Sequence, residues 1–350
     1  MKNKDLRKAN KAKKDEFYTQ LVDIEKEIKH YRKHFENKVV YCNCDDPHVS
    51  NFFHYFSYNF EKLGLKKLIA SCYKNQNMDL FSQNNSEQAI YLEYDGDKNG
   101  NNVPDIEEVG VKDLNGDGDF RSRESIELLK RADIIVTNPP FSLFREYVAQ
   151  LVKYNKKFII IGNLNSVTYK EIFKLIKKKE LWFGASIHSG DREFGVPDDY
   201  PLTAASSRID SKGKKFVRVK GVRWFTNLDY NERYEDLILY KKYSPDKYLK
   251  YENYDAINVN KTKDIPVDYK GHMGVPITFL DKYNPEQFEI IGLGISNSGK
   301  EIGVQPYKYE HKKYRKEVQK RGAVDGDLYM MIDGIVKVPY ARIIIKNKRL

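Results

Sequence analysis

A short turn motif directly follows the apolar segment 133–136 and has the residue types to act on an amine. It consists of Asn138, Pro139, Pro140 and Phe141. An exocyclic amine on a heteroaromatic ring is a poor nucleophile because its lone pair is delocalised. The Asn138 side-chain oxygen and the Pro139 carbonyl can accept its two N–H bonds, which favours a pyramidal nitrogen whose lone pair faces an electrophile. The prolines fix φ, and Phe141 offers a stacking face. The alternative is that Asn-Pro-Pro only ends a strand and turns the chain.

A loop region rich in Asp, Gly and Asn offers a second candidate site. The spacing of a calcium-binding loop is satisfied by Asp113, Asn115, Asp117, Gly118 and Glu124. The preceding segment 103–112 contains Pro and Gly and is a poor entering helix, while Arg121 and Arg123 would add positive charge beside an ion. Turn formation by Asp and Gly is the alternative.

Three cysteines, Cys42, Cys44 and Cys72, make no disulfide framework and indicate a reducing compartment. Cys42 and Cys44 together with His48 or His54 suggest zinc. However, a lone C-x-C lacks a second ligand pair at a plausible spacing. We therefore expect packed thiols and predict no metal site.

Apolar strands alternate with helical segments from residue 38 to about residue 180. Strands are expected at 38–44, 66–73, 89–95, 133–138 and 156–163. Helices are expected at 50–64, 122–132, 141–154 and 166–179, the first capped by Ser50 and ended by Gly64. The alternation predicts an α/β protein in which parallel strands, joined by right-handed crossovers, form a doubly wound sheet. Ligands of such sheets lie at the carboxyl ends of the strands, near the switch in strand order.

The composition points to a polyanionic partner. The 350 residues include 61 Lys and Arg against 50 Asp and Glu, a formal net charge of +11. No stretch approaches the roughly 18 unbroken apolar residues of a spanning helix, and the first residues do not read as a secretory signal, so we expect no membrane association. Residues 1–14 carry seven Lys and Arg and one acid, which indicates a flexible basic arm that is either solvated or in contact with DNA.

Beyond about residue 180 the sequence becomes strand-rich, with Gly and Pro breaks and interleaved Lys, Arg and Tyr. Three basic segments stand out, at 211–225, 240–254 and 307–321. Such segments are a solvated face in an arbitrary protein, but they bind phosphates in a protein that acts on nucleic acid.

Five segments together resemble a known family. They are DEFYTQ at 15–20, VYCNCDDP at 40–47, GDGDFR at 116–121, NPPF at 138–141 and MGVPITF at 273–279. NPPF after a strand is similar to the catalytic motif of S-adenosylmethionine-dependent amino-methyltransferases. All five segments, in this order, resemble the EcoRI-type adenine-specific DNA methyltransferase family across nearly the whole chain.

The resemblance implies a binding site for S-adenosylmethionine. Its residues would be Tyr18, Thr19, Cys42, Asn43, Asp45, Asp46, Asp119 and Phe120. The first two fall where related enzymes contact the methionine end of the cofactor, and the next four occupy the loop after the first strand. The last two match an Asp that accepts from the cofactor's adenine amine and an aromatic that covers its ring. This sequence departs from the pattern in two places, because no Gly-rich turn follows the first strand and the second ends in Cys72-Tyr73 rather than an acid.

The resemblance also implies a Rossmann-like methyltransferase sheet in a catalytic domain at 15–180, followed by a mixed, strand-rich target-recognition region at 181–350. Trp182, Phe183 and Phe194 lie where related enzymes place an aromatic against the extruded base. Simple core packing is the favoured explanation for each of them.

The implied activity is site-specific methyl transfer to N6 of an adenine flipped out of double-stranded DNA, as the modification half of a restriction–modification system. We expect a bacterial cytoplasmic protein that acts at the nucleoid, as a monomer without an obligatory protein partner. Two other functions stay open. The same motif is similar to that of enzymes that methylate RNA bases or protein glutamine, and a non-catalytic DNA-binding protein with calcium-stabilised Asp/Gly loops is the second.

Overall fold

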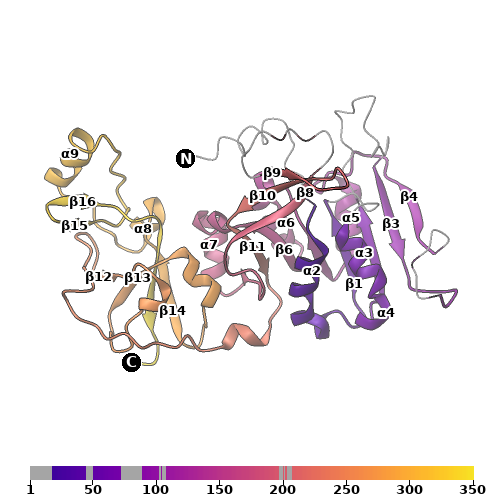
Figure 1. The fold of residues 1–350 in the computed structure, drawn as a ribbon, viewed down its shortest axis with the longest axis horizontal. Coiled ribbons are helices and arrows are strands. Elements are labelled where there is room, and N and C mark those ends of the chain that lie inside the picture. The colour runs from indigo at the N-terminus through magenta and orange to yellow at the C-terminus, as the bar shows by residue number, and fades with distance from the viewer. Residues whose placement is uncertain are drawn as a thin grey trace. The chain divides into compact units, whose positions relative to one another are not determined.

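The computed structural model describes residues 18–44, 50–71, 89–101, 104, 108–196, 200, 202 and 207–350 (Figure 1). The predicted arm at 1–14, the cofactor residues Asp45 and Asp46, and Cys72-Tyr73 lie outside the described residues. The chain divides into two compact units. The first comprises Met1–Ser166 and Phe183–Tyr230, and the second comprises Val167–Trp182 and Asn231–Leu350.

A large sheet has eight strands in the order β4-β3-β2-β1-β5-β6-β11-β7 (Figure 1). The strands are β1 (Val39–Asn43), β2 (Lys67–Ser71), β3 (Ile90–Tyr94), β4 (Gly110–Asp113), β5 (Ile134–Thr137), β6 (Lys157–Asn163), β7 (Trp182–Phe183) and β11 (Val222–Thr226). All five strands expected from the sequence are present within a few residues of their predicted bounds. The central strands β1, β2, β5 and β6 are apolar and buried because the sheet is covered on both faces.

The strand directions make this a mixed α/β sheet. β1 runs parallel to β2 and β5, and β5 runs parallel to β6, as expected. β3 is antiparallel to β2, so the expectation of parallel pairing is wrong for the strand at 89–95. β4 and β11 are also antiparallel to their neighbours. The reason is physical: a parallel pair needs a long crossover, usually a helix, and the sequence between β2 and β3 carries no helical pattern.

Helices cover the sheet. They are α2 (Leu21–Ile28), η1 (Lys29–His34), α3 (Asn51–Tyr58), α4 (Phe60–Leu63), α5 (Arg123–Arg131), η2 (Phe141–Leu143), α6 (Phe144–Lys153) and η3 (Leu164–Thr168). Helices α2 and η1 were not among the elements expected from the sequence. The Ser50 hydroxyl accepts a hydrogen bond from Phe52 N at 3.2 Å and caps α3, and Gly64 ends α4 at φ +63°, both as predicted. Four aromatic side chains of α3 are buried in the core, namely Phe52, Phe53, Tyr55 and Phe56, whereas Tyr58 is exposed.

A small antiparallel sheet, in the order β8-β10-β9, packs on the same core. Its strands are β8 (Asp191–Val196), β9 (Ser207–Ile209) and β10 (Lys215–Lys220). Val217 and Val219 of β10 point into the core, while Arg218 and Lys220 alternate with them and are exposed.

The second unit contains a four-stranded sheet in the order β12-β13-β17-β14 and the hairpin β15-β16. Its strands are β12 (Ala256–Asn258), β13 (His272–Pro276), β14 (Phe288–Leu293), β15 (Met330–Ile332), β16 (Ile335–Lys337) and β17 (Arg342–Asn347). Its helices are α7 (Lys170–Lys177), η4 (Asn231–Tyr234), η5 (Thr262–Asp264), η6 (Ile277–Lys282), α8 (Ser296–Glu301) and α9 (Tyr309–Glu317). Among the described residues, every helix is too short or too polar to cross a lipid bilayer.

Candidate active site

Residues of the predicted catalytic and cofactor segments lie together at the carboxyl ends of the central strands of the large sheet. β1 and β5 are parallel neighbours, so Asn43 at the end of β1 and Asn138 just after β5 lie at adjacent strand ends. The chain runs from β1 through β2 and β3 on one side and then crosses to β5 and β6 on the other. This is the switch in strand order at which open α/β sheets bind ligands. Both side chains are buried, with exposed fractions of 6% and 5%.

The backbone carbonyls of the two prolines in the Asn-Pro-Pro-Phe turn differ in their hydrogen bonding. The carbonyl of Pro140 accepts a hydrogen bond from Leu143 N at 3.0 Å and starts η2. Pro139 is buried, and no described residue donates a hydrogen bond to its carbonyl. Phe141 is partly buried and packs against the main core, which fixes its ring. The turn thus combines a carbonyl that accepts no hydrogen bond from a described residue with a partly buried aromatic side chain.

Helix α6, which follows the turn, ties the predicted segments together. The hydroxyl of Tyr147 donates a hydrogen bond to Asn43 Oδ1, and the Tyr147 ring meets Phe120 edge-on with centroids 5.0 Å apart. Gln150 Nε2 donates to the Phe120 carbonyl at 2.8 Å. Burial raises the pKa of Tyr147 well above its usual value, so the hydroxyl keeps its proton and remains a donor. The sequence motifs did not indicate Tyr147 or Gln150, although their spacing of three places both on one side of the helix beside the buried Phe144.

Asp119 directly precedes Phe120 in the chain, and its carboxylate forms an ion pair with Arg121. Its carboxylate accepts from Arg121 Nε at 2.9 Å and from Arg121 Nη2 at 2.6 Å. This hydrogen bonding raises the pKa of Arg121, whose Nη1 also reaches Glu146 on α6 at 3.0 Å. If Asp119 accepts a hydrogen bond from the adenine amine of the cofactor, the amine would share the carboxylate with Arg121. The proposed role of Asp119 stays a prediction.

The Asp/Gly loop uses its acidic residues for turn formation. The Glu124 carboxylate accepts the backbone N–H groups of Asn115 at 3.0 Å and Gly116 at 2.7 Å, which lowers its pKa. Asp117 Oδ1 accepts from Asp119 N at 3.0 Å. The Asp117 contact is an Asx-type turn, and the Glu124 contacts hold the loop against the start of α5. Within the described residues, no three His, Cys, Asp or Glu side chains are placed to share a metal ion.

The N-terminal motif lies between α3 and β8. Tyr18 and Gly195 exchange backbone hydrogen bonds of 2.8 and 3.0 Å, and Asn51 Nδ2 donates to the Thr19 carbonyl at 2.7 Å. Thr19 Oγ1 is buried without a hydrogen-bond partner among the described residues, and so is Thr137 Oγ1 at the end of β5. Because a buried hydroxyl without a partner is costly, two of them at predicted site segments favour a polar ligand there.

The two cysteines of the first strand have different surroundings. Cys42 is buried in the main core, which confirms the expected packed thiol and turns its side chain away from the strand ends. Cys44 adopts φ +76°, the left-handed region that favours glycine. Backbone strain of this kind is concentrated at functional sites, and Cys44 directly follows the end of β1.

The aromatic residues predicted near an extruded base behave mainly as core. Phe183 and Phe194 are buried, with exposed fractions of 3% and 2%, which agrees with the favoured packing explanation. Trp182 is partly buried, and the guanidinium carbon of Arg233 lies 3.6 Å from its ring centroid.

Comparison with known proteins decides the family. The family described as "Adenine-specific methyltransferase EcoRI" matches residues 5–348. The chain is 52% identical to the type II methyltransferase M.EcoRI of Escherichia coli, over 99% of this chain and 98% of that protein. This chain belongs to that family.

Two further relatives come from mycoplasmas. The type II methyltransferases M.MgeORF184P of Mycoplasma genitalium and M.MpnI of Mycoplasma pneumoniae are 43% and 41% identical, each over 81% of this chain and 84% of its own length. No solved structure matches the chain. Membership of this family of adenine-specific methyltransferases confirms the resemblance that the five sequence segments carried.

Proposed function

We propose that this chain methylates N6 of a specific adenine in double-stranded DNA, as the modification enzyme of a restriction–modification system. The adenine specificity of the family and the type II methyltransferases among the relatives support it. The observation that carries the mechanism is the Asn138–Pro139 turn at the switch in strand order, whose Pro139 carbonyl accepts no hydrogen bond from any described residue.

The turn orients the amine of the target base. An adenine flipped out of the stack lies against Phe141, and its amine donates to Asn138 Oδ1 and to the Pro139 carbonyl. The rigid Pro-Pro backbone sets the direction of the Pro139 carbonyl, so this acceptor needs little rearrangement. Asn138 is only 5% exposed, and the base therefore has to displace its present packing neighbours to reach it. Catalysis rests on positioning, because no side chain has to donate or remove a proton before the attack.

The residues of the site fit S-adenosylmethionine, which when bound supplies an electrophilic methyl group on a sulfonium. Thr19 offers a buried hydroxyl that has no partner among the described residues. Asn43 is held by Tyr147, and Phe120 presents an aromatic face that Tyr147 supports from its edge. Together with Tyr18 and the backbone of Cys42, these groups would hold the cofactor. Asp119, Asp45 and Asp46 are proposed to complete the site.

The finer organisation is also proposed rather than established. The parallel centre of the mixed sheet supports a Rossmann-like methyltransferase core with antiparallel additions. We propose that residues 15–180 form the cofactor-binding catalytic domain, that residues 181–350 carry target recognition, and that residues 1–14 form a basic arm. We further propose that the enzyme acts as a monomer in the bacterial cytoplasm, at the nucleoid.

Replacement of Asn138 by Ala tests the mechanism. Loss of one preorganised acceptor is expected to lower kcat about 10²- to 10³-fold while the affinity for S-adenosylmethionine stays near that of the wild type. Asn43→Ala, at the end of the neighbouring strand, is the matched contrast and should weaken cofactor binding instead. Single-turnover methylation and cofactor titration separate the two effects. Near-native turnover by Asn138→Ala would refute the mechanism.

A further inference from the structure

Helix α9 and the turn after it form the most basic surface segment of the second unit. Residues 308–321 contain seven Lys and Arg and two Glu, and no residue of α9 is buried. Three of the lysines pair with carboxylates: Lys308 with Glu252, Lys312 with Asp325 and Lys313 with Glu317. The other four cations, Arg315, Lys316, Lys320 and Arg321, form no ion pair with a described residue. The charge of this segment is therefore concentrated at the C-terminal end of α9.

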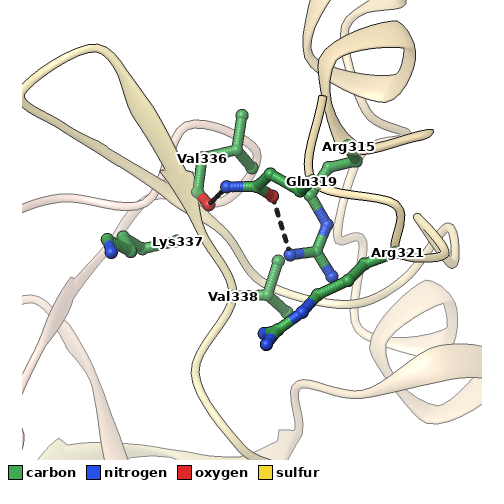
Figure 2. Close-up of a pocket in the computed structure, with 6 residues that line it drawn as sticks. All are labelled: Arg315, Gln319, Arg321, Val336, Lys337 and Val338. Atoms are coloured by element: carbon green, nitrogen blue, oxygen red, sulfur yellow. Dashed lines mark hydrogen bonds between the residues drawn. The ribbon is translucent and has the colours of Figure 1, made fainter. Parts of the chain in front are cut away.

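A cavity of about 360 Å³ lies at this end of the helix, and we call it the α9 pocket (Figure 2). It is lined by Arg315, Gln319, Arg321, Val336, Lys337 and Val338. Three of the six residues are cations and none is an acid. Such a composition attracts an anion, because no carboxylate competes for the positive groups.

Arg315 is fixed by neutral acceptors. Its Nε and Nη2 donate to the Gly322 carbonyl at 3.3 and 3.0 Å, and its Nη1 donates to Gln319 Oε1 at 3.0 Å. Gln319 Nε2 in turn donates to the Val336 carbonyl at 2.9 Å, as Figure 2 shows. The guanidinium is thus oriented while its charge is not neutralised, and some of its five N–H donors remain for a ligand.

The chain reversal after α9 brings a second guanidinium next to the first. Lys320 adopts φ +52°, and Arg321 N donates to the Arg315 carbonyl at 3.0 Å. In Figure 2 the side chains of Arg315 and Arg321 extend from the same side toward the strand that carries Val336. The Arg321 side chain has no partner among the described residues and is exposed.

A small aromatic core makes the pocket rigid. Tyr307 and Tyr329 stack with centroids 4.3 Å apart and an interplanar angle of 8°, and both pack against Val336 of β16. Tyr314 of α9 packs on the same cluster. Helix and strand are therefore held together without a ligand, which lowers the entropic cost of binding one.

We propose that the α9 pocket binds a backbone phosphate of the DNA substrate. The proposal rests on the proposed function, which makes DNA the polyanion that this chain meets. Both ends of the Gln319 amide are already hydrogen-bonded, so this amide is not available to read a base edge, and the other polar side chains of the pocket are cations that suit a phosphate. Such a contact positions the duplex and carries no sequence information.

The salt dependence of DNA binding tests the proposal with Arg321→Ala. Loss of one phosphate contact reduces the slope of log Kobs against log salt by about 0.9, equally for cognate and unrelated duplexes. Lys312→Ala is the matched control, because it removes the same charge from the same basic segment at a site already paired with Asp325 at 3.0 Å. Lys312→Ala should leave the slope unchanged, and Arg321→Lys should keep most of the wild-type slope. Thermal melting verifies that each variant is folded.

Three results would overturn the proposal. One is an unchanged slope for Arg321→Ala, and a second is an effect on the cognate duplex alone, which would mean base reading. The third is a combination of two observations: inorganic phosphate without DNA stabilises the wild type but not Arg321→Ala, and the salt slope of DNA binding is the same for both. That combination would mean that the pocket is a site for a free anion. Absence of transfer by the wild type itself would refute the proposed function, but it would leave the slope test of the pocket valid.

Discussion

The hydrogen bond from Tyr147 to Asn43 should couple the strand end to cofactor binding. Tyr147→Phe removes the hydroxyl but keeps the ring that contacts Phe120. Asn43 is 6% exposed, so its Oδ1 loses a donor that water replaces poorly, at a cost of about 1–3 kcal/mol. If this cost appears in cofactor binding, the KM for S-adenosylmethionine rises about 5- to 150-fold while kcat at saturation changes little.

Tyr251→Phe is the control for this prediction. Its hydroxyl donates to Asn258 Oδ1 at 2.8 Å and is also buried, but it lies in the second unit. We expect a comparable loss of stability in urea unfolding and an unchanged KM for the cofactor. An equal KM for Tyr147→Phe and the wild type, or an equal rise in both variants, would refute the assignment of Asn43 to the cofactor site.

Two further predictions concern stability. Glu27 is fully buried on α2 and accepts hydrogen bonds from the backbone N–H groups of Ala185 and Ser186 at 2.8 Å each, so Glu27→Ala should cost about 3 kcal/mol or more in urea unfolding. The exposed Glu25→Ala on the same helix should cost less than about 0.5 kcal/mol, and equal effects would contradict the anchoring role. Burial raises the pKa of Glu93, but hydrogen bonds from Arg131 and Lys112 outweigh it and set the pKa below 4.5. A carboxylate whose pKa is lowered in the folded state contributes stability at neutral pH, and this stability is lost as the pH falls through the folded-state pKa. Glu93→Gln should therefore lower the free energy of unfolding by about 1 kcal/mol or less at neutral pH, and the difference from the wild type should shrink when unfolding is measured at lower pH. A deficit that grows below pH 4.5 would contradict the sign.

The sequence predicted the elements well where apolar runs are long. β1, β5 and β6 are buried along nearly their whole length, and such runs indicate central strands regardless of what surrounds them. The position of Asn138 directly after a strand was enough to place it at the carboxyl edge of the sheet, beside Asn43. The positions of these residues at the strand ends could therefore be predicted from the sequence, because they depend only on which residues directly follow each strand.

The features of the fold and of the site that the sequence did not predict depend mainly on contacts between residues far apart in the chain. The direction of β3 is set by pairing rather than by its own sequence, and it came out antiparallel. The link between Tyr147 and Asn43 spans 104 positions, and a tyrosine on a helix face gives no sign of its partner. The ion pair between Asp119 and Arg121 is local, but the same carboxylate also fits a cofactor contact, so the residue types alone did not distinguish the two.

The most direct test of the central claim is base-resolution mapping of methyl groups after the protein has been incubated with unmethylated duplex DNA and S-adenosylmethionine. The account predicts N6-methyladenine within one recurring sequence, and its loss with Asn138→Ala. Methyl groups on cytosine, on RNA or on protein glutamine, or the same adenine methylation by Asn138→Ala, would contradict it.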